Sequence, residues 1–307
     1  MRTTFINSLI ELAENDKNLI LLTADMGFGV FERFKEKYPN QYYNVGIAEQ
    51  NLIGVAAGLA MTGKKVYVYS IIPFLTMRAY EQIRIDICYH NLDIKLIGVG
   101  GGLAYGPAGA THHSIEDLGI MRVLPNMKVF APGDPIEAKE IFLKTYSNSY
   151  PCYIRLSKNN EPIINEKKEI FLGKANPIVI GEDIALLTCG NMLELSKKIV
   201  DITLKDHSKK ISLYSFHTIK PIDEEKIKEI INKYTKVLIL EEHNVYGGLY
   251  SAFMEVVGRN IDGIKTKSIL PFGIKDTFSH YVGSQDFIRE CYGLTRKKII
   301  KEIVSNR

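Results

Sequence analysis

The chain has 307 residues, of which 46% are hydrophobic and 24% are charged, values that are ordinary for a globular protein. Its formal net charge of +4 is spread along the chain, which argues against binding to nucleic acid. No apolar run reaches the roughly 20 residues of a membrane span, and acidic residues soon follow the N-terminus, so we expect a cytoplasmic protein with no membrane span or signal peptide. Four widely spaced cysteines (Cys88, Cys152, Cys189 and Cys291) indicate reduced, mostly buried thiols.

Short apolar strands alternate with helical segments over the first half of the chain. The predicted strands cover residues 18–24, 42–45, 65–70, 94–99, 127–130 and 152–156. The predicted helices cover residues 3–14, 30–38, 51–61, 73–89, 115–123 and 136–146. Repeated strand–helix units of this length predict a parallel sheet with helices on both faces.

A polar stretch without periodicity separates this series from a second one. The second series has predicted strands at 183–188, 210–214, 236–240 and 264–270, and helices at 193–204, 223–234, 248–257, 284–291 and 294–304. We therefore expect an α/β protein with two doubly wound domains, each with a mainly parallel sheet covered by helices on both faces. The expected boundaries are 1–160 for the first domain, 161–173 for a linker and 174–307 for the second domain.

Side chains able to carry chemistry follow the predicted carboxyl ends of the first-domain strands, where open α/β sheets bind ligands. Five features lie at such ends: Asp25, Glu49, the segment after Ser70, a glycine-rich loop over 98–109, and Arg155 with Lys158. The loop does not follow the first strand, so it is not a dinucleotide fingerprint. Its glycines either let the backbone approach a ligand closely or simply adopt backbone angles that other residues rarely adopt.

Glu49 is a lone carboxylate within an apolar segment that runs from residue 45 to residue 60. A carboxylate in such surroundings is partly desolvated, which marks it as a candidate for sharing a proton. The alternative is an acid at the start of a helix, stabilised by the helix dipole.

Two further elements can serve the same site. Phe74, Met77 and Tyr80 recur every third residue, so in a helix they share a face that is either part of the core or a wall for a planar ring. His112 can transfer a proton near neutral pH, while one of the histidines at 112 and 113 can be purely structural. Ser114 is expected to cap the next helix, with Asp117 as its capping-box acid.

The run Asn-Val-Gly-Ile-Ala-Glu-Gln at 44–50 resembles the signature of transketolases and deoxyxylulose-phosphate synthases in their pyrimidine-binding domain for thiamine diphosphate. The similarity continues through residues 22–25, 74–80, 111–112 and 132–138, and residues 217–223 and 241–248 resemble the transketolase C-terminal domain. The Gly-Asp-Gly motif of the family's preceding domain does not occur in the sequence. The chain therefore resembles the C-terminal subunit of a split, two-chain transketolase.

The resemblance implies transfer of a two-carbon ketol unit from a ketose, expected to be phosphorylated, to an aldose. By motif, Glu49 would bond the aminopyrimidine ring nitrogen of thiamine diphosphate, and His112 would contact the reacting carbons. The implied cofactor-binding residues are Asp25, Glu49, Phe74, Met77 and Tyr80. The implied substrate-binding residues are Arg2, Arg155, Lys158 and His112. Gly29, Gly100 and Ala108 stand where the family carries substrate-reading side chains, which leaves the sugar open.

The resemblance also implies a partner, because no metal ligand is assigned to this chain. An N-terminal subunit with the diphosphate-binding domain would hold Mg²⁺ or Ca²⁺, in an assembly of two copies of each chain. Two alternatives stay open: a subunit like the β chain of 2-oxoacid dehydrogenase E1 or like deoxyxylulose-phosphate synthase, and a non-catalytic scaffold or regulatory paralogue. In the second domain, His217 and His243 are expected to be structural.

Overall fold

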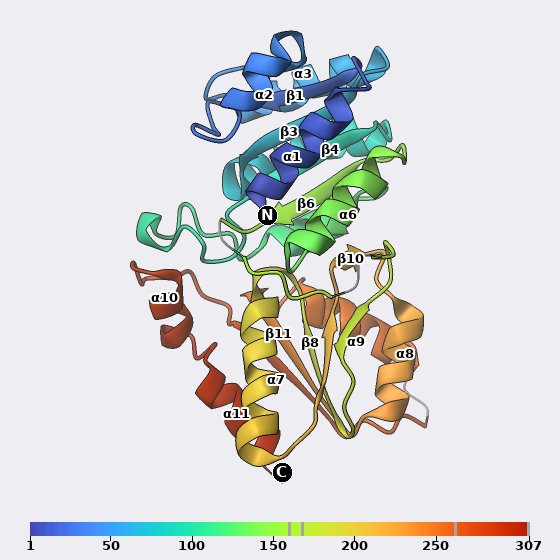
Figure 1. Ribbon diagram of the computed structural model, residues 1–307, viewed down its shortest axis with the longest axis vertical. Helices are drawn as coiled ribbons and strands as arrows, with labels where there is room; N and C mark the ends of the chain where they lie inside the picture. The colour runs from blue at the N-terminus through green and yellow to red at the C-terminus, as the bar shows by residue number, and fades with distance from the viewer. Residues whose placement is uncertain (159–160, 167–168, 261–262, 306–307) are drawn as a thin grey trace.

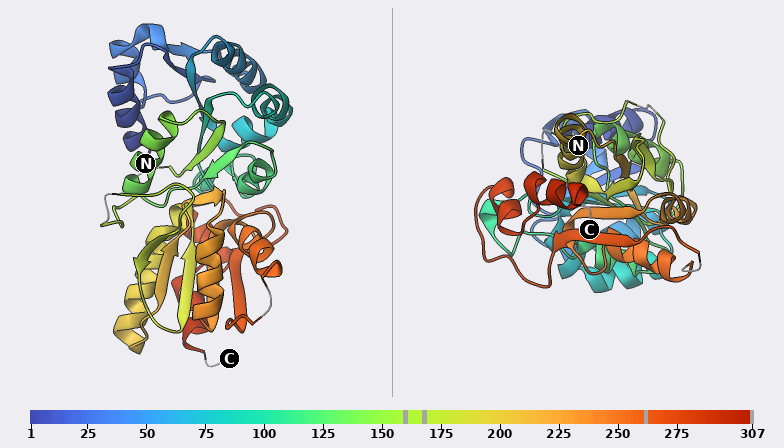
Figure 2. Two further views of the ribbon diagram at one scale, coloured as in Figure 1. Left: turned by 90° about the vertical axis from the view of Figure 1, so that its right-hand side faces the viewer. Right: turned by 90° about the horizontal axis from the view of Figure 1, so that it is seen from below.

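The computed structural model describes residues 1–158, 161–166, 169–260 and 263–305. Figure 1 shows two α/β domains stacked along the long axis, with the N-terminus near their junction and the C-terminus at the far end of the second domain. Each domain has a mostly parallel sheet with helices on both faces, as Figure 2 also shows, so the predicted fold class is confirmed. Residues 159–160 and 167–168, at the predicted boundary and in the predicted linker, lie outside the described residues.

The sheet of the first domain has the strand order β10-β5-β6-β4-β3-β1-β2 across the described residues. Its first-domain strands are parallel to their neighbours. They are β1 (Leu19–Thr23), β2 (Tyr42–Asn44), β3 (Lys65–Ile71), β4 (Ile94–Val99), β5 (Lys128–Phe130) and β6 (Cys152–Leu156). Because helices cover both faces, β1, β4 and β6 are buried along their whole length.

Two helical layers bury this sheet. On one face, α1 (Arg2–Ala13) and α6 (Pro135–Tyr146) lie side by side, and Phe5 of α1 packs against Tyr69 and Phe142. The other face is covered by α3 (Glu49–Met61), the helical segment over 73–89 and α5 (Asp117–Arg122). The remaining short elements are α2 (Glu32–Lys37), η1 (Pro39–Gln41) and η4 (Gly106–Ala108).

The segment over 73–89 is helical, but it is not the regular α-helix that the sequence predicts. It consists of two π-helical stretches, η2 (Pro73–Arg78) and η3 (Ile83–Tyr89), joined by the short α4 (Tyr80–Gln82). Ala79 interrupts the helical backbone, with φ −106° and ψ 24°. π-Helical turns are wider than α-turns and are frequent at functional sites, so a three-residue spacing no longer places side chains on one face.

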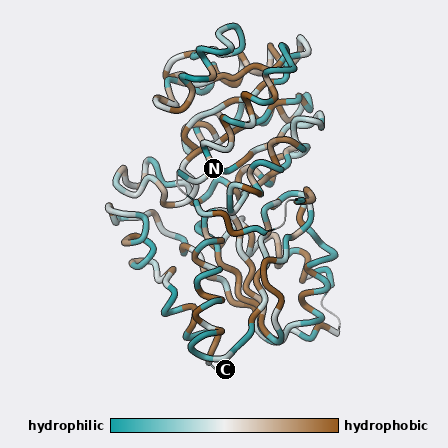
Figure 3. The backbone as a smooth tube through the Cα atoms, viewed as in Figure 1, coloured by the Kyte–Doolittle hydropathy of each residue, from teal (hydrophilic) through white to brown (hydrophobic). Residues whose placement is uncertain are grey.

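The second sheet has the order β12-β11-β8-β9-β7 across the described residues, with only the edge strand β7 antiparallel to its neighbour. Its strands are β7 (Asn176–Val179), β8 (Ile184–Thr188), β9 (Ser212–Ser215), β11 (Lys236–Asn244) and β12 (Ser268–Ile274). Its helices are η5 (Gly190–Met192), α7 (Leu193–His207), α8 (Glu224–Lys233), α9 (Leu249–Gly258), α10 (Gln285–Cys291) and α11 (Arg296–Val304). Figure 3 shows hydrophobic residues concentrated in the central strands and polar stretches on the surrounding helices.

One strand crosses between the domains. β10 (Thr218–Lys220) follows β9 of the second domain, yet it pairs antiparallel with β5 of the first sheet. The backbone N–H of Ala131 also donates to the carbonyl of His217 at 2.8 Å. The two domains therefore share main-chain hydrogen bonds, which fix β5 and the residue that follows it against the second domain.

Two compositional expectations can be compared with the structure. The four cysteines are all free, and Cys88, Cys152 and Cys189 are buried, as predicted, whereas Cys291 is exposed. Within the described residues, every helix is either too short or too polar to cross a lipid bilayer.

Candidate active site

Glu49 is the first residue of α3, and its side chain is only 2% exposed. The residue before it, Ala48, provides no side-chain cap. The Glu49 carboxylate itself lies in the first turn, where the helix dipole favours negative charge. Its Oε2 accepts a hydrogen bond from Nη1 of Arg78 at 2.6 Å. The Arg78 guanidinium also lies 4.6 Å from the ring centroid of Phe74. The buried carboxylate thus meets a planar cation that rests on an aromatic ring.

Asp25 and the turn before Glu49 are held together by Asn44, whose role the sequence did not reveal. The Asp25 backbone N–H donates to Oδ1 of Asn44 at 2.8 Å, and Nδ2 of Asn44 donates back to the Asp25 carboxylate at 3.2 Å. The same Oδ1 accepts from the backbone N–H of Gly46 at 3.0 Å. Asn44 therefore fixes the ends of β1 and β2, from which the chain turns into α3.

The three side chains predicted to form one wall have different surroundings. Phe74 lies edge-on to His112, with ring centroids 5.1 Å apart. Met77 is 37% exposed. The Tyr80 hydroxyl donates to the carbonyl of Ile120 at 2.8 Å, which ties its ring to α5. The π-helical backbone explains the difference, and Phe74 is the member of the set that contacts both Arg78 and His112.

His112 lies on a loop whose two ends are joined. Gly102 and Ser114 exchange backbone hydrogen bonds of 2.9 and 2.8 Å, which close the loop between them. The Thr111 hydroxyl lies 2.9 Å from Nδ1 of His112, which orients the imidazole. The rings of Phe74 and Tyr105 both meet the imidazole edge-on, so the ring is held from two sides.

Tyr105 connects this loop to two cations, and sequence reasoning missed it. Nζ of Lys158 lies 5.1 Å from the centroid of the Tyr105 ring. Burial raises the pKa of the Tyr105 hydroxyl and the nearby Arg2 guanidinium opposes that rise. Burial likewise raises the pKa of Tyr69 to about 12, against the opposing effect of Arg2. At Gly100, whose φ is +92°, a Cβ would lie 2.2 Å from the Tyr105 ring, so glycine there is what lets the ring pack.

Arg155, which is expected to bind substrate, is buried and bonded within the protein. The residue is 3% exposed, and its Nε donates to Asp117 at 2.9 Å. Its Nη2 donates to the carbonyls of Ser114 and Glu242 at 2.8 and 2.9 Å. The guanidinium is thus committed to buried partners from both domains, and the structure supports a role beneath the His112 loop, not contact with substrate.

The expected helix cap is also corrected by this network. Asp117 is fully buried, and it accepts from Arg155 and from the Tyr153 hydroxyl at 2.6 Å. Helix α5 begins at Asp117 without a side-chain cap, and Ser114 makes its described bonds through its backbone. A buried acid beside a buried arginine therefore replaces the predicted capping box.

The other histidines near strand ends are buried. His113 lies under the loop, with Nε2 3.4 Å from the carbonyl of Gly106, and burial lowers its pKa. His217 and His243 are both fully buried, and Nδ1 of His243 lies 2.7 Å from the carbonyl of Asn244. These surroundings fit the structural role expected for His217 and His243.

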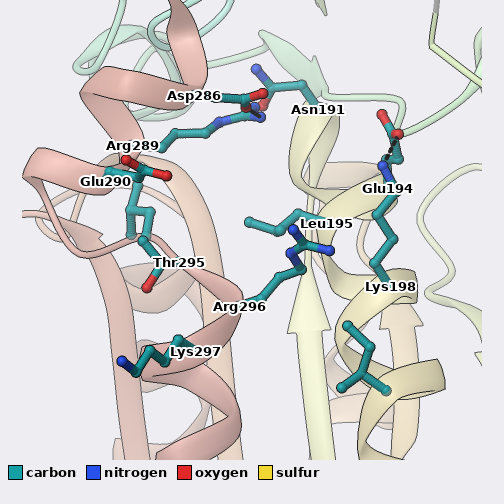
Figure 4. A pocket seen from close by; sticks show the side chains of 12 residues that line it. Asn191, Glu194, Leu195, Lys198, Asp286, Arg289, Glu290, Thr295, Arg296 and Lys297 are labelled. Carbon is teal, nitrogen blue, oxygen red and sulfur yellow. Dashed lines mark hydrogen bonds and ion pairs between the residues drawn. The ribbon is translucent and has the colours of Figure 1, made fainter.

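A separate cavity of about 530 Å³ lies in the second domain, between α7 and the α10–α11 region. Figure 4 shows that acidic and basic side chains line it together, with Lys198 paired to Glu194. Arg289 is bonded to Glu242 and Asp286. Because side chains of both charges line it, the cavity does not point to one class of ligand.

The residues near Glu49 fit a planar, N–H-donating aromatic ring. The group that is bonded to the Glu49 carboxylate in the structure indicates this. The Arg78 guanidinium is planar, donates an N–H to Glu49 and lies over the Phe74 ring, and these are the two contacts that an aminopyrimidine would make. Among the described residues, no group of three or more His, Cys, Asp or Glu side chains is arranged to hold a metal ion.

Comparisons with known proteins cover nearly the whole chain. Residues 1–162 match the family model of the transketolase pyrimidine-binding domain, and residues 173–299 match that of the transketolase C-terminal domain. The chain is 36% identical to the "putative transketolase C-terminal section" of Methanocaldococcus jannaschii, over 99% of this chain and 95% of that protein. It is 31% identical to one subunit of the apulose-4-phosphate transketolase of Phocaeicola vulgatus, over 91% of this chain and 92% of that subunit.

A solved structure gives the same likeness in three dimensions. The protein described as "split gene transketolase, inactive beta4 tetramer" superimposes with a TM-score of 0.88 and 32% sequence identity. The match covers 98% of this chain and 96% of that one. The similarity therefore includes both domains and their arrangement.

Proposed function

Because the chain belongs to the transketolase family and corresponds to its C-terminal section, we propose that it is the catalytic C-terminal subunit of a two-chain transketolase. The reaction would move a two-carbon ketol unit from a ketose to an aldose. The observation that carries the proposal is the buried Glu49 carboxylate, bonded to a planar cation over Phe74, within the family motif. When bound, thiamine diphosphate would supply the nucleophile and the electron sink for this chemistry.

In this proposal, Glu49 holds and shares a proton with a ring nitrogen of the cofactor. Its carboxylate is buried in the first turn of α3, so it is held in a fixed position, which suits a bond to one ring nitrogen. Phe74 supports one side of the ring, and Asp25, positioned by Asn44, lies at the neighbouring strand end. Met77 and Tyr80 belong to the same helical segment as Phe74. The exposed Met77 would border the cofactor ring on its outer edge, and Tyr80, bonded to Ile120, would border it on its inner edge.

His112 would exchange protons with the substrate oxygens next to the bond that breaks. Thr111 already contacts Nδ1, so we assign the exchange to Nε2. Phe74 and Tyr105 limit rotation of the imidazole, which preserves the orientation that proton transfer needs.

We propose a substrate with an anionic group at the end remote from the reacting carbons. Lys158 and Arg2 both lie near Tyr105, and the Tyr105 ring in turn contacts His112. Two cations in one place suit a phosphate ester, and the relative named for apulose-4-phosphate is consistent with this class. Arg155 is not included, since its donors are used inside the protein.

The diphosphate and its metal ion, Mg²⁺ or Ca²⁺, would be held by a partner subunit. The chain matches, along almost their whole length, relatives that are named as a C-terminal section and as a subunit, so we propose an assembly of two copies of this chain with two copies of a separate N-terminal subunit. The solved structure described as an inactive tetramer of β chains is consistent with a need for such a partner.

Turnover by a Glu49→Gln variant tests this proposal. Glutamine keeps the size of the side chain but cannot exchange the proton, so the assembled complex should lose at least about 100-fold in kcat, the size typical of proton-transfer roles. Asp201→Asn, which changes an exposed acid on α7 paired with Lys197, is the matched control and should turn over normally. Unchanged turnover with Glu49→Gln would reject the catalytic assignment and favour a scaffold or regulatory subunit.

A further inference from the structure

The Arg78 side chain is 45% exposed, yet two contacts hold its guanidinium. Its Nη1 donates to the buried Glu49 carboxylate at 2.6 Å, and its guanidinium lies 4.6 Å from the centroid of the Phe74 ring. Within the described residues, Glu49 is the acid with which Arg78 forms an ion pair. The carboxylate that the proposed function needs for the cofactor is therefore already occupied.

The guanidinium offers the same two contacts that the cofactor ring requires. It is planar, it donates an N–H to a carboxylate, and it stacks on an aromatic face. An aminopyrimidine that bonded Oε2 of Glu49 and lay on the same face of Phe74 would take the place of the guanidinium, so the two groups compete for these contacts.

The local backbone allows this displacement. Arg78 is the last residue of the π-helical η2, and Ala79 breaks the helical geometry directly after it. The side chain as a whole is 45% exposed, so solvent is accessible to it when the guanidinium turns away from Glu49. Glu49, by contrast, is fixed in the first turn of α3.

We propose that Arg78 is a placeholder for the cofactor ring. In the chain without cofactor it neutralises Glu49 and keeps that buried carboxylate in position, and it moves aside when the ring binds. The inference rests on the proposed function, because it assumes that Glu49 meets the aminopyrimidine. Arg78 is thus a positioning residue that holds Glu49 in place and competes with the cofactor ring for it.

Two measurements on Arg78→Met separate this role from a merely structural one. Methionine keeps a long apolar chain over Phe74 but removes the charge and the donors. The thermal midpoint of the isolated variant chain should fall, because Glu49 loses its partner. The complex with the partner subunit should bind thiamine diphosphate with Mg²⁺ about threefold to tenfold more tightly, because a competing, partly exposed ion pair is gone. A structural role would lower both the midpoint and the affinity.

Two further variants complete the test. Arg84→Met removes an exposed arginine on η3 for which no ion pair is described, and it should change neither quantity. Arg78→Lys keeps the charge but not the planar group, so both of its values should lie between those of wild type and Arg78→Met. Weaker or unchanged cofactor binding by the Arg78→Met complex would overturn the placeholder role. If the wild-type complex does not bind the cofactor at all, the proposed function itself fails, and the placeholder role fails with it.

Discussion

Replacing Arg155 by methionine should destabilise the protein far more than it changes substrate affinity. The guanidinium is 3% exposed, pairs with the fully buried Asp117 and donates to two buried carbonyls, one in each domain. Removing one member of a buried ion pair leaves the other charge uncompensated, at a cost of about 3–5 kcal/mol. Because stabilities of about 5–15 kcal/mol are usual, this would be a large fraction of the total.

Urea denaturation followed by circular dichroism measures the loss as a fall in the midpoint. Arg259→Met is the matched control, because it breaks the exposed ion pair with Glu224 and should cost less than about 1 kcal/mol. Adding Asp117→Asn to Arg155→Met should recover part of the loss, since no buried charge is then left alone. A stability loss no larger than that of Arg259→Met, together with a raised KM for the anionic substrate, would show that Arg155 binds substrate.

Three other predictions follow from the site. Lys158→Met should raise KM for a phosphorylated substrate about tenfold while the thermal midpoint stays within a degree or two, because it removes one charge-assisted contact from an exposed position; an unchanged KM would place the anionic group elsewhere. Gly100→Ala should lower stability by at least about 1 kcal/mol in urea, because alanine meets both a φ of +92° and the Tyr105 ring; a neutral result would mean that the ring moves freely. Burial lowers the pKa of His113 from its ordinary value of 6.5. As the pH falls below 6.5, the unfolded chain therefore binds a proton at this histidine before the native chain does. The contribution of His113 to stability is thus present above pH 6.5 and is lost as the pH falls further. The urea midpoint should therefore fall less between about pH 7.5 and pH 5.5 in His113→Gln than in wild type; equal falls would exclude His113 as a cause.

The parallel strands and most helices could be predicted because their signals are local. The apolar runs of β4 and β6 match the predicted ranges residue for residue. β10 could not be predicted in this way, because three residues that pair with a strand of the other domain have no periodicity of their own. β7 is a short antiparallel edge strand containing Pro177, and β12 contains Pro271 and Gly273, which obscured where it begins and ends.

In the candidate site, too, residues next to predicted strand ends could be identified from the sequence, whereas contacts between distant residues could not. Glu49 and His112 follow strand ends in the sequence, and the structure places both beside Phe74 or its immediate partner Arg78. The partners of Arg155 could not be predicted, because they lie about 40 to 90 positions away along the chain. Tyr105 was missed because a lone tyrosine in a glycine-rich loop carries no motif.

The π-helical backbone over 73–89 was also beyond sequence reasoning. Counting residues in threes assumes an α-helix, and nothing in the composition of this segment signals wider turns. That geometry is what separates Phe74 from Tyr80 and brings Arg78 to Glu49. The nearest signal in the sequence was Arg78 itself, a charge among aromatic and aliphatic residues, which becomes informative only once its partner is known.

The central claim is that Glu49 forms half of a cofactor site that a partner subunit completes. Calorimetric titration of thiamine diphosphate with Mg²⁺ tests it directly, on the chain alone, on its complex with the partner subunit and on the Glu49→Gln complex. We expect no binding by the chain alone and binding by the wild-type complex. Binding by the variant complex should be weaker by about tenfold or more, the effect of losing one charge-assisted hydrogen bond. Tight binding by the chain alone, or equal binding by the two complexes, would contradict it.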